Sequence, residues 1–265
     1  MHTGQHYGPL VIVANHTDID RCFPTGRHYP GIADLIADAN QRVEGLSHAF
    51  SASDSWRSVP LVVIDFETTG TNPEEDRVIE IGVVRYSDGK IQAREGLLID
   101  PTVPIPEESR AVHGITDEEL AGAPTFAKVV PKILELLQGH LPIAYNANFD
   151  RRFLHAELRR AGVDLEAEAH TLPPAANPEV VWLDPLVWAR EIFVDLKSRR
   201  LGDIAKHLGV PLEQAHRATG DAEATLGVLL KLSDKMPAAY GEVIRIQKRY
   251  AAFQEAAFAA WKRNR

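Results

Sequence analysis

A run of β-branched residues that ends in two carboxylates is the feature that most constrains this chain. In the stretch VPLVVIDFETTG, an apolar segment leads directly into Asp65 and Glu67, with Phe66 between them. Such a run is typical of a buried strand, and residues two apart on a strand leave the same face. We therefore expect Asp65 and Glu67 to project together from a strand end while Phe66 points into the core. For this motif alone, a strand end whose acids simply face water is an equal alternative.

The pattern around this motif predicts an α/β fold. Strands are expected at 61–66, 78–86 and 90–99, and the SDGK turn makes the last two a hairpin. Two shorter apolar segments, LPIAYN and VVWLD, are separated by helical patterns and should add in parallel. A short helix is expected at GITDEEL, where Thr116 and Glu119 have capping-box spacing. Another is expected at 148–161, with Asn148 as its N-cap. Further helices are expected at 125–138, RLGDIAKHLGV, 218–232 and 239–263. The sequence thus predicts a mixed sheet of three antiparallel and two parallel strands, flanked by helices.

The same pattern divides the chain into three parts. Residues 1–57 are an N-terminal extension of unknown role, turn-rich except for an amphipathic helix expected at 31–50. Residues 58–235 form the α/β domain, and residues 236–265 form a basic C-terminal helix with six Lys or Arg and two Asp or Glu. The formal net charge of the whole chain is −8, which argues against a protein coated in basic surface.

Composition also limits the location of the protein. Cys22 is the single cysteine among 265 residues, so no intrachain disulfide forms, which fits a reducing cytoplasm. No apolar run approaches the roughly 20 residues that span a bilayer, and the N-terminus lacks the pattern of a secretory signal. We therefore expect a cytoplasmic protein that does not enter a membrane.

Two later motifs carry further acids. Asp150, in YNANFDRRFL, falls in the first turn of a helix that follows a strand, where the positive helix end steadies an anion; an ordinary helix-starting acid is the alternative. In AHRATGDAEATL, His216 and Asp221 would diverge by about 140° on one continuous helix. Gly220 instead suggests that His216 lies on a loop and Asp221 near a helix start, so that both face one cleft. A loop histidine that is simply solvated is the alternative.

The three motifs are stronger evidence for a functional site together than any one of them is alone. Each places an acid at a strand end or a helix start, where α/β proteins gather their sites. Carboxylates brought together raise one another's pKa unless a cation lies between them. An all-oxygen ligand set suits Mg²⁺ or Mn²⁺ rather than Zn²⁺ or copper. We therefore expect divalent cations at a shared acidic site.

In this order, DFETTG, NANFD and HRATGD resemble the three exonuclease motifs of the DEDDh 3′–5′ exonuclease family. That family has an RNase H-like fold and includes the proofreading epsilon subunit of bacterial DNA polymerase III, which this chain resembles. The runs RVIEIGVVRY, PIPEESRAVHGITDEEL, GAPTF and DPLVWAREI are also similar to segments of the family. The resemblance covers about residues 61–232.

The resemblance implies a two-metal phosphodiester hydrolase that releases nucleoside 5′-monophosphates from the 3′ end of DNA, in proofreading or repair. By analogy, Asp65, Glu67 and Asp221 hold the metal that activates water, and Asp65 also bridges to a second metal supported by Asp150. His216 is the implied general base. The implied partners are single-stranded DNA or frayed 3′ ends, and a polymerase.

Several alternatives stay open at this point. An RNA exonuclease of the same family is the first rival, because recognition of the 2′-hydroxyl is not visible in the sequence. A non-catalytic module that binds nucleic acid or a polymerase is the second, although every motif acid and the histidine are present. Thr68, Thr69 and His113 are further candidates for substrate contact, with turn chemistry or a structural role as the alternative. Glu80, in VIEIG, lies either near the site or on the outward face of its strand.

Overall fold

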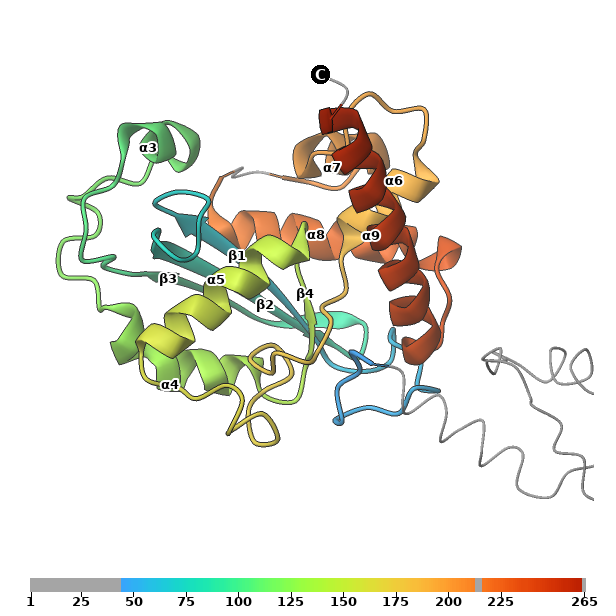
Figure 1. The fold of residues 1–265 in the computed structure, drawn as a ribbon, viewed down its shortest axis with the longest axis horizontal. Helices are drawn as coiled ribbons and strands as arrows, with labels where there is room; N and C mark the ends of the chain where they lie inside the picture. The colour runs from blue at the N-terminus through green and yellow to red at the C-terminus, as the bar shows by residue number, and fades with distance from the viewer. Residues whose placement is uncertain (1–43, 213–215, 264–265) are drawn as a thin grey trace, which may run out of the picture.

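The protein is described here by a computed structural model that defines residues 44–212 and 216–263. Its centre is a mixed sheet with the strand order β3–β2–β1–β4 (Figure 1). Strands β1 (Leu61–Thr68), β2 (Val78–Ser87) and β3 (Lys90–Leu98) are antiparallel neighbours, and β4 (Leu141–Ile143) pairs with β1 in parallel. The predicted fold class, a mixed sheet flanked by helices, is confirmed.

The expected fifth strand, VVWLD, is shorter than predicted. It contributes one parallel bridge, between Ile143 and Leu183. Directly afterwards Asp184 caps a helix, accepting a hydrogen bond from the Leu186 N–H at 2.9 Å, and Pro185 occupies the first turn. A proline cannot donate to a ladder and suits a helix start. The chain therefore leaves the sheet after one residue pair.

Seven helices are described in the resolved part of the chain, and they cover both faces of the sheet (Figure 1). Helices α4 (Phe126–Leu137) and α5 (Ala147–Arg160) pack on one face, and α8 (Ala218–Leu232) packs on the other. The remaining helices are α3 (Glu107–His113), α6 (Pro185–Ile192), α7 (Leu201–Leu208) and α9 (Tyr240–Arg263). Of these four, α6, α7 and α9 extend the core beneath α8.

The side chains of β1 alternate between the two cores. Val62, Ile64 and Phe66 enter the core under α4 and α5, whereas Leu61 and Val63 enter the core under α8. Because the strand period is two residues, the odd-numbered positions that follow Val63 continue on the α8 side. This alternation aims the two acids of the DFE motif at α8 and keeps Phe66 in the opposite core.

Local capping differs from the sequence prediction at two places. Helix α5 begins at Ala147 with Asn146 as N-cap, so the expected N-cap Asn148 is wrong. Asp184 explains the earlier start, because its carboxylate accepts the N–H groups of Asn146 and Ala147, each at 3.0 Å. GITDEEL forms turns rather than a helix, although Thr116 and Glu119 do make the reciprocal hydrogen bonds of a capping box.

The segment that precedes the sheet packs against α9. Trp56 is fully buried, and its indole N–H donates to the Pro237 carbonyl at 2.7 Å. The Ser47 N–H donates to the Tyr240 hydroxyl at 2.9 Å, and the Tyr240 N–H donates to the Asp54 carbonyl at 2.8 Å. Residues 44–57 and α9 therefore share one core with the sheet. The division into parts at 57 and 235 stays a prediction.

Other expectations concern residues at the margins of the described chain. Most of the amphipathic helix predicted at 31–50 lies outside the described residues, and residues 44–50 form turns and irregular structure. No helix in the described ranges is both long and apolar enough to cross a membrane.

We predict that Trp56→Ala lowers the free energy of unfolding by about 3–5 kcal/mol, because it removes a buried aromatic side chain and leaves a cavity. Phe253→Ala, on the same helix that Trp56 packs against, is the control. Its side chain is 65% exposed, so we expect a change within about 0.5 kcal/mol. Urea denaturation measures both. Equal stabilities for the two variants would show that residues 44–57 are not part of the folded core.

Candidate active site

Close packing of α8 on the sheet brings two motif acids together. A Cβ placed on Gly82 of β2 would lie 2.1 Å from the Ala218 carbonyl carbon, at the first residue of α8. Only a glycine permits this approach. Asp221, in the first turn of α8, is thereby brought down to the α8-facing side of β1, where Asp65 and Glu67 project.

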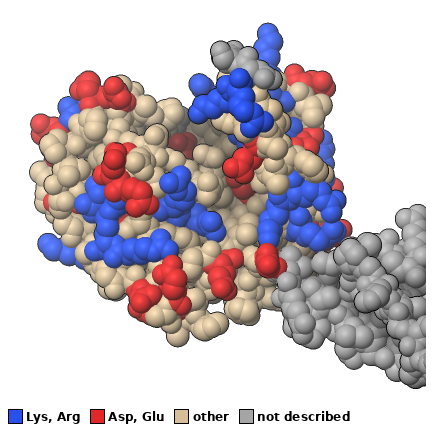
Figure 2. Space-filling view, in the orientation of Figure 1, with Lys and Arg blue, Asp and Glu red and all other residues tan. Residues whose placement is uncertain are grey.

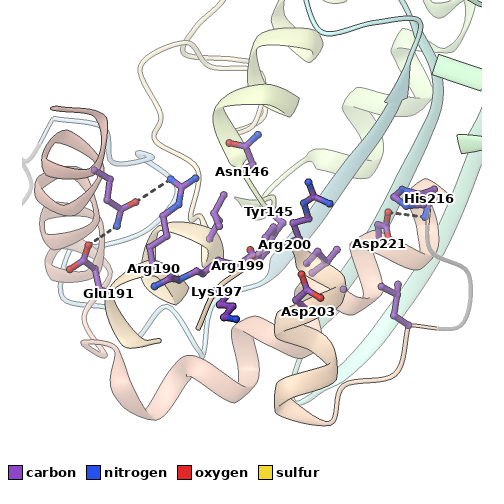
Figure 3. A pocket seen from close by; sticks show the side chains of 15 residues that line it. Tyr145, Asn146, Arg190, Glu191, Lys197, Arg199, Arg200, Asp203, His216 and Asp221 are labelled. Carbon is purple, nitrogen blue, oxygen red and sulfur yellow. Dashed lines mark hydrogen bonds between the residues drawn. The ribbon is translucent and has the colours of Figure 1, made fainter. Parts of the chain in front are cut away.

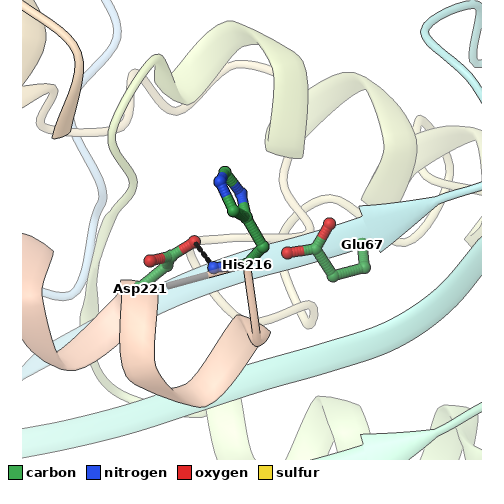
Figure 4. A group of neighbouring side chains, drawn as sticks. All are labelled: Glu67, His216 and Asp221. Carbon is green, nitrogen blue, oxygen red and sulfur yellow. Dashed lines mark hydrogen bonds between the residues drawn. The ribbon is translucent and has the colours of Figure 1, made fainter. Parts of the chain in front are cut away.

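Glu67, His216 and Asp221 form a compact group (Figure 4). Each offers one ligand atom, and these atoms lie within 4.8 Å of one another. His216 lies in a turn with φ of 63°, and its backbone N–H donates to Asp221 Oδ2 at 3.1 Å. The left-handed backbone at His216 lets the ring stand between the two carboxylates. The structure thus places His216 on a loop and Asp221 near a helix start, as their spacing predicted.

Asp150 joins the group from the opposite side of β1. It lies in the first turn of α5, is 3% exposed, and its Oδ1 accepts the Phe66 N–H at 3.1 Å. This hydrogen bond fastens Asp150 to the residue between Asp65 and Glu67. The four predicted acids therefore converge at one end of β1, with His216 beside them.

The electrostatics of the site reflect that convergence. Burial raises the pKa of Asp65 well above its usual value, and the charges of Asp150, Asp221 and Glu67 raise it further. Burial, with the charges of Asp221 and Glu80, raises the pKa of Glu67 to about 8. Burial likewise raises the pKa values of Asp150 and Asp221, although each also accepts a backbone N–H that favours its ionised form. Such a group is short of positive charge, and its oxygen ligands suit hard divalent cations.

Sequence reasoning missed the ion pair that holds the His216 loop. Glu80 pairs with Glu67 across β1 and β2, is 4% exposed, and accepts hydrogen bonds from Arg217 Nη2 at 2.9 Å and Nε at 3.1 Å. The same carboxylate accepts the Ala218 N–H at 3.0 Å. Glu80 therefore lies near the site, and it anchors the residue directly after His216. An acid in an otherwise apolar strand, opposite Glu67, was the available signal.

A second missed group fixes the start of α5. Asp184 accepts three backbone N–H groups, from Asn146, Ala147 and Leu186, and burial raises its pKa to about 6. Gln247 of α9 accepts the Asp184 N–H at 2.8 Å and donates to the Trp182 carbonyl at 2.8 Å. Through this chain of hydrogen bonds, α9 helps to position the helix that carries Asp150. No local pattern marks Gln247, because its partners lie about 60 residues away.

The candidate substrate contacts Thr68, Thr69 and His113 already form hydrogen bonds within the protein. The Thr68 hydroxyl donates to the Gly70 carbonyl, and the Thr69 hydroxyl accepts the Arg77 N–H, both within the loop after β1. His113 is 6% exposed and its Nδ1 accepts the Ile115 N–H at 3.0 Å, while its Nε2 is buried without a partner in the described residues. Substrate contact by these three residues stays a prediction.

Comparison with known proteins places this geometry in a family. The pattern of the RNase_T exonuclease family matches residues 62–229. Among curated relatives, DNA polymerase III PolC-type of Clostridium perfringens is 35% identical over 199 residues, which is 75% of this chain and 12% of that protein. The Thermotoga petrophila protein of the same name is 32% identical over 77% of this chain and 14% of its own length. The chain therefore spans about an eighth of the length of these relatives.

Solved structures agree in fold. E. coli exonuclease I in complex with a dT13 oligonucleotide superposes with a TM-score of 0.56 at 21% identity, covering 67% of this chain and 41% of that one. Exonuclease I from Methylocaldum szegediense gives a TM-score of 0.56 at 23% identity, covering 69% and 42%. The family match includes all three motifs and more than half of the chain. This chain therefore belongs to the RNase_T exonuclease family.

Proposed function

We propose that this protein is a 3′–5′ exonuclease that hydrolyses DNA and releases nucleoside 5′-monophosphates. The observation that carries the proposal is the convergence of Asp65, Glu67, Asp150 and Asp221 beside His216, within a domain of an exonuclease family. A strand-end acid that merely faces water would not be buried against three others. The geometry therefore favours a functional role for these acids over the solvated alternative.

The residues fit divalent cations, and we propose two, Mg²⁺ or Mn²⁺. Asp65, Glu67 and Asp221 would hold one, and Asp65 and Asp150 the other. Their raised pKa values mean that the ionised carboxylates need a positive partner, and carboxylate oxygens are the ligands that these ions prefer. When bound, the cations supply a water nucleophile at neutral pH and neutralise charge on the phosphate.

His216 is the proposed general base. Its backbone is fixed by Asp221, but its ring forms no hydrogen bond within the described residues and lies among the carboxylate oxygens. A free imidazole nitrogen at that place would accept a proton from the attacking water, which is the task of a general base. Asp221 thus has two roles, as a cation ligand and as the acceptor that orients the His216 loop.

DNA is the proposed substrate because the relatives are named as DNA polymerases and a structural neighbour is described with a DNA oligonucleotide. Single-stranded DNA or a frayed 3′ end fits a proofreading or repair role, in the cytoplasm and with a polymerase as partner. RNA stays the alternative, since no residue described at the site distinguishes a 2′-hydroxyl. A purely binding module is disfavoured, because a site without catalysis has no need for four buried acids.

The proposed function is tested with a 5′-labelled single-stranded 20-mer in Mg²⁺, resolved by length. We expect a ladder that shortens from the unlabelled 3′ end, with no cleavage in EDTA and recovery on addition of Mn²⁺. Asp65→Asn, which keeps the side-chain shape, should be folded and inactive. A matched RNA strand run in parallel decides between DNA and RNA. One internal cut, or an uncut strand under all conditions, would refute the exonuclease proposal.

The raised carboxyl pKa values predict how metal-free stability depends on pH. A carboxyl with a raised pKa keeps its proton in the folded state at pH values where the unfolded chain has lost it. Stability therefore falls as pH rises from about 4.5, and the contribution of Glu67 is lost as pH rises to its pKa of about 8. In EDTA, we expect a melting temperature several degrees lower at about pH 8.5 than at about pH 5.

Glu67→Gln is the matched control for this pH dependence, because it removes one titrating group without changing shape. The variant should lose less stability between the two pH values than the wild type does. Mn²⁺ should raise the wild-type melting temperature more at the higher pH. Identical pH profiles for wild type and variant would contradict the assigned environment of Glu67.

Arg217→Gln should lower turnover about 10–100-fold and raise the Mg²⁺ concentration needed for half-maximal rate. The variant frees the loop of His216, and misplacement of a reacting group by about 1 Å costs rate on this scale. It also removes the positive charge that lowers the Glu67 pKa. Arg94→Gln is the control, because the Arg94–Glu223 pair joins β3 to α8 in the same bidentate way but is exposed. If both variants behave alike, the Glu80–Arg217 pair has no positioning role.

A further inference from the structure

An open groove of about 940 Å³ extends from His216 and Asp221 toward α6 and α7 (Figure 3). Tyr145 and Asn146, which follow β4, are among the residues that line it. Its far side is formed by α6, α7 and the segment 193–200 that joins them. The groove therefore begins at the proposed reaction site and leads away from it.

Four cations line this groove: Arg190, Lys197, Arg199 and Arg200. None of them forms an ion pair with a carboxylate in the described chain, whereas Arg77, Arg94, Arg110, Arg159, Arg160 and Arg217 all do. Lys197 and Arg200 are exposed, and their side chains make no hydrogen bond to described residues. Lys and Arg side chains also gather on the lobe built from α6, α7 and the end of α9, beside a hollow (Figure 2). Unpaired cations also occur elsewhere on the described chain, for example Lys90 and Lys128, so the specific feature is that four cations line one groove that reaches His216. Glu191 and Asp203 line the same groove without pairing with these cations.

The segment that carries these cations is fixed to the reaction site. The Tyr145 hydroxyl donates to the Arg199 carbonyl at 2.6 Å, and Arg199 Nη2 donates to the Val194 carbonyl at 2.7 Å. Arg199 Nε is buried and has no partner in the described residues. Arg200 is the N-cap of α7, whose first turn also carries Asp203. The backbone that carries these cations is therefore fixed to Tyr145, which follows β4, while the Lys197 and Arg200 side chains keep their freedom to contact a ligand.

We propose that this groove binds the sugar–phosphate backbone of a single nucleic-acid strand behind its 3′-terminal nucleotide, with Lys197 and Arg200 contacting phosphates. This inference rests on the proposed function, because it assigns the path of that substrate. Cations on flexible stems contact phosphates without reading the bases. Tyr145, which lines the groove, already uses its hydroxyl on Arg199. Binding is therefore independent of sequence and dependent on salt.

The size of the groove fits an unpaired strand. A volume of about 940 Å³ is in the range that encloses one small organic ligand, which leaves room for a few unpaired nucleotides. The proposed strand runs between the basic residues of the 193–200 segment and the acids, which would hold the scissile phosphate through bound divalent cations.

The double variant Lys197→Glu/Arg200→Glu tests this path. The double variant Lys90→Glu/Lys128→Glu is its control. The control makes the same charge change at two exposed lysines on β3 and α4 that form no ion pair with the described residues and lie outside the groove. Binding of a fluorescent single-stranded 20-mer is measured by anisotropy in Ca²⁺ at several salt concentrations. We expect at least tenfold weaker binding for the groove variant. Its slope of log K against log salt should fall by about 1.4, for two lost phosphate contacts.

Hydrolysis of a dinucleotide separates strand binding from chemistry. The groove variant should lose at least ten times less kcat/KM on the dinucleotide than on the 20-mer, and the control should match the wild type on both. Equal losses on the two substrates, or wild-type binding of the 20-mer, would overturn the groove assignment. If the wild type hydrolyses neither substrate, the proposed function fails, while the anisotropy comparison still decides whether the groove binds a strand.

Discussion

Mutual repulsion among carboxylates is the constraint on which the rest of the site depends. Asp65, Glu67, Asp150 and Asp221 come from one strand and two helix starts and meet at one end of β1, where burial and like charge raise their pKa values. Such an arrangement is unfavourable for a chain without cations. It persists because neighbouring elements leave the acids little freedom to separate, and it creates the field that a pair of hard cations would neutralise.

Two polar networks supply that rigidity. The Glu80–Arg217 pair joins β2 to the start of α8 and so fixes the loop of His216. Asp184 and Gln247 join the end of β4 to α9 and so fix the start of α5. In each network, a buried carboxylate accepts backbone N–H groups at a helix start, which both satisfies those groups and sets the helix position. The site is thus held by groups that do not themselves face the substrate.

The sequence predicted the sheet and the site to different degrees. The first three strands, the helices α4, α5, α7, α8 and α9, and the face to which Asp65 and Glu67 point follow from local periodicity, which the structure retains. The helix expected at GITDEEL is absent, and α3 and α6 were not predicted. The fifth strand was over-predicted, because an apolar run does not reveal that Asp184 and Pro185 begin a helix at once. Asn148 was predicted as the N-cap because the local sequence does not show that Asp184 accepts the N–H groups of Asn146 and Ala147. The acceptor for those N–H groups comes from 37 residues away, where no local rule finds it.

Local chemistry in the sequence determined which residues were available: β-branched runs for the strands, glycines where backbones must approach, and acids at strand ends and helix starts. Tertiary structure alone decided which of these residues meet. Only packing of α8 against Gly82 brings Asp221 to Glu67, and only the folded chain brings the cations of the 193–200 segment to the groove that His216 lines. The physical reason is the distance along the chain over which each kind of interaction acts. Periodicity and capping act over a few residues, whereas burial, ion pairing and electrostatic potential depend on groups that are distant in the chain and adjacent in space.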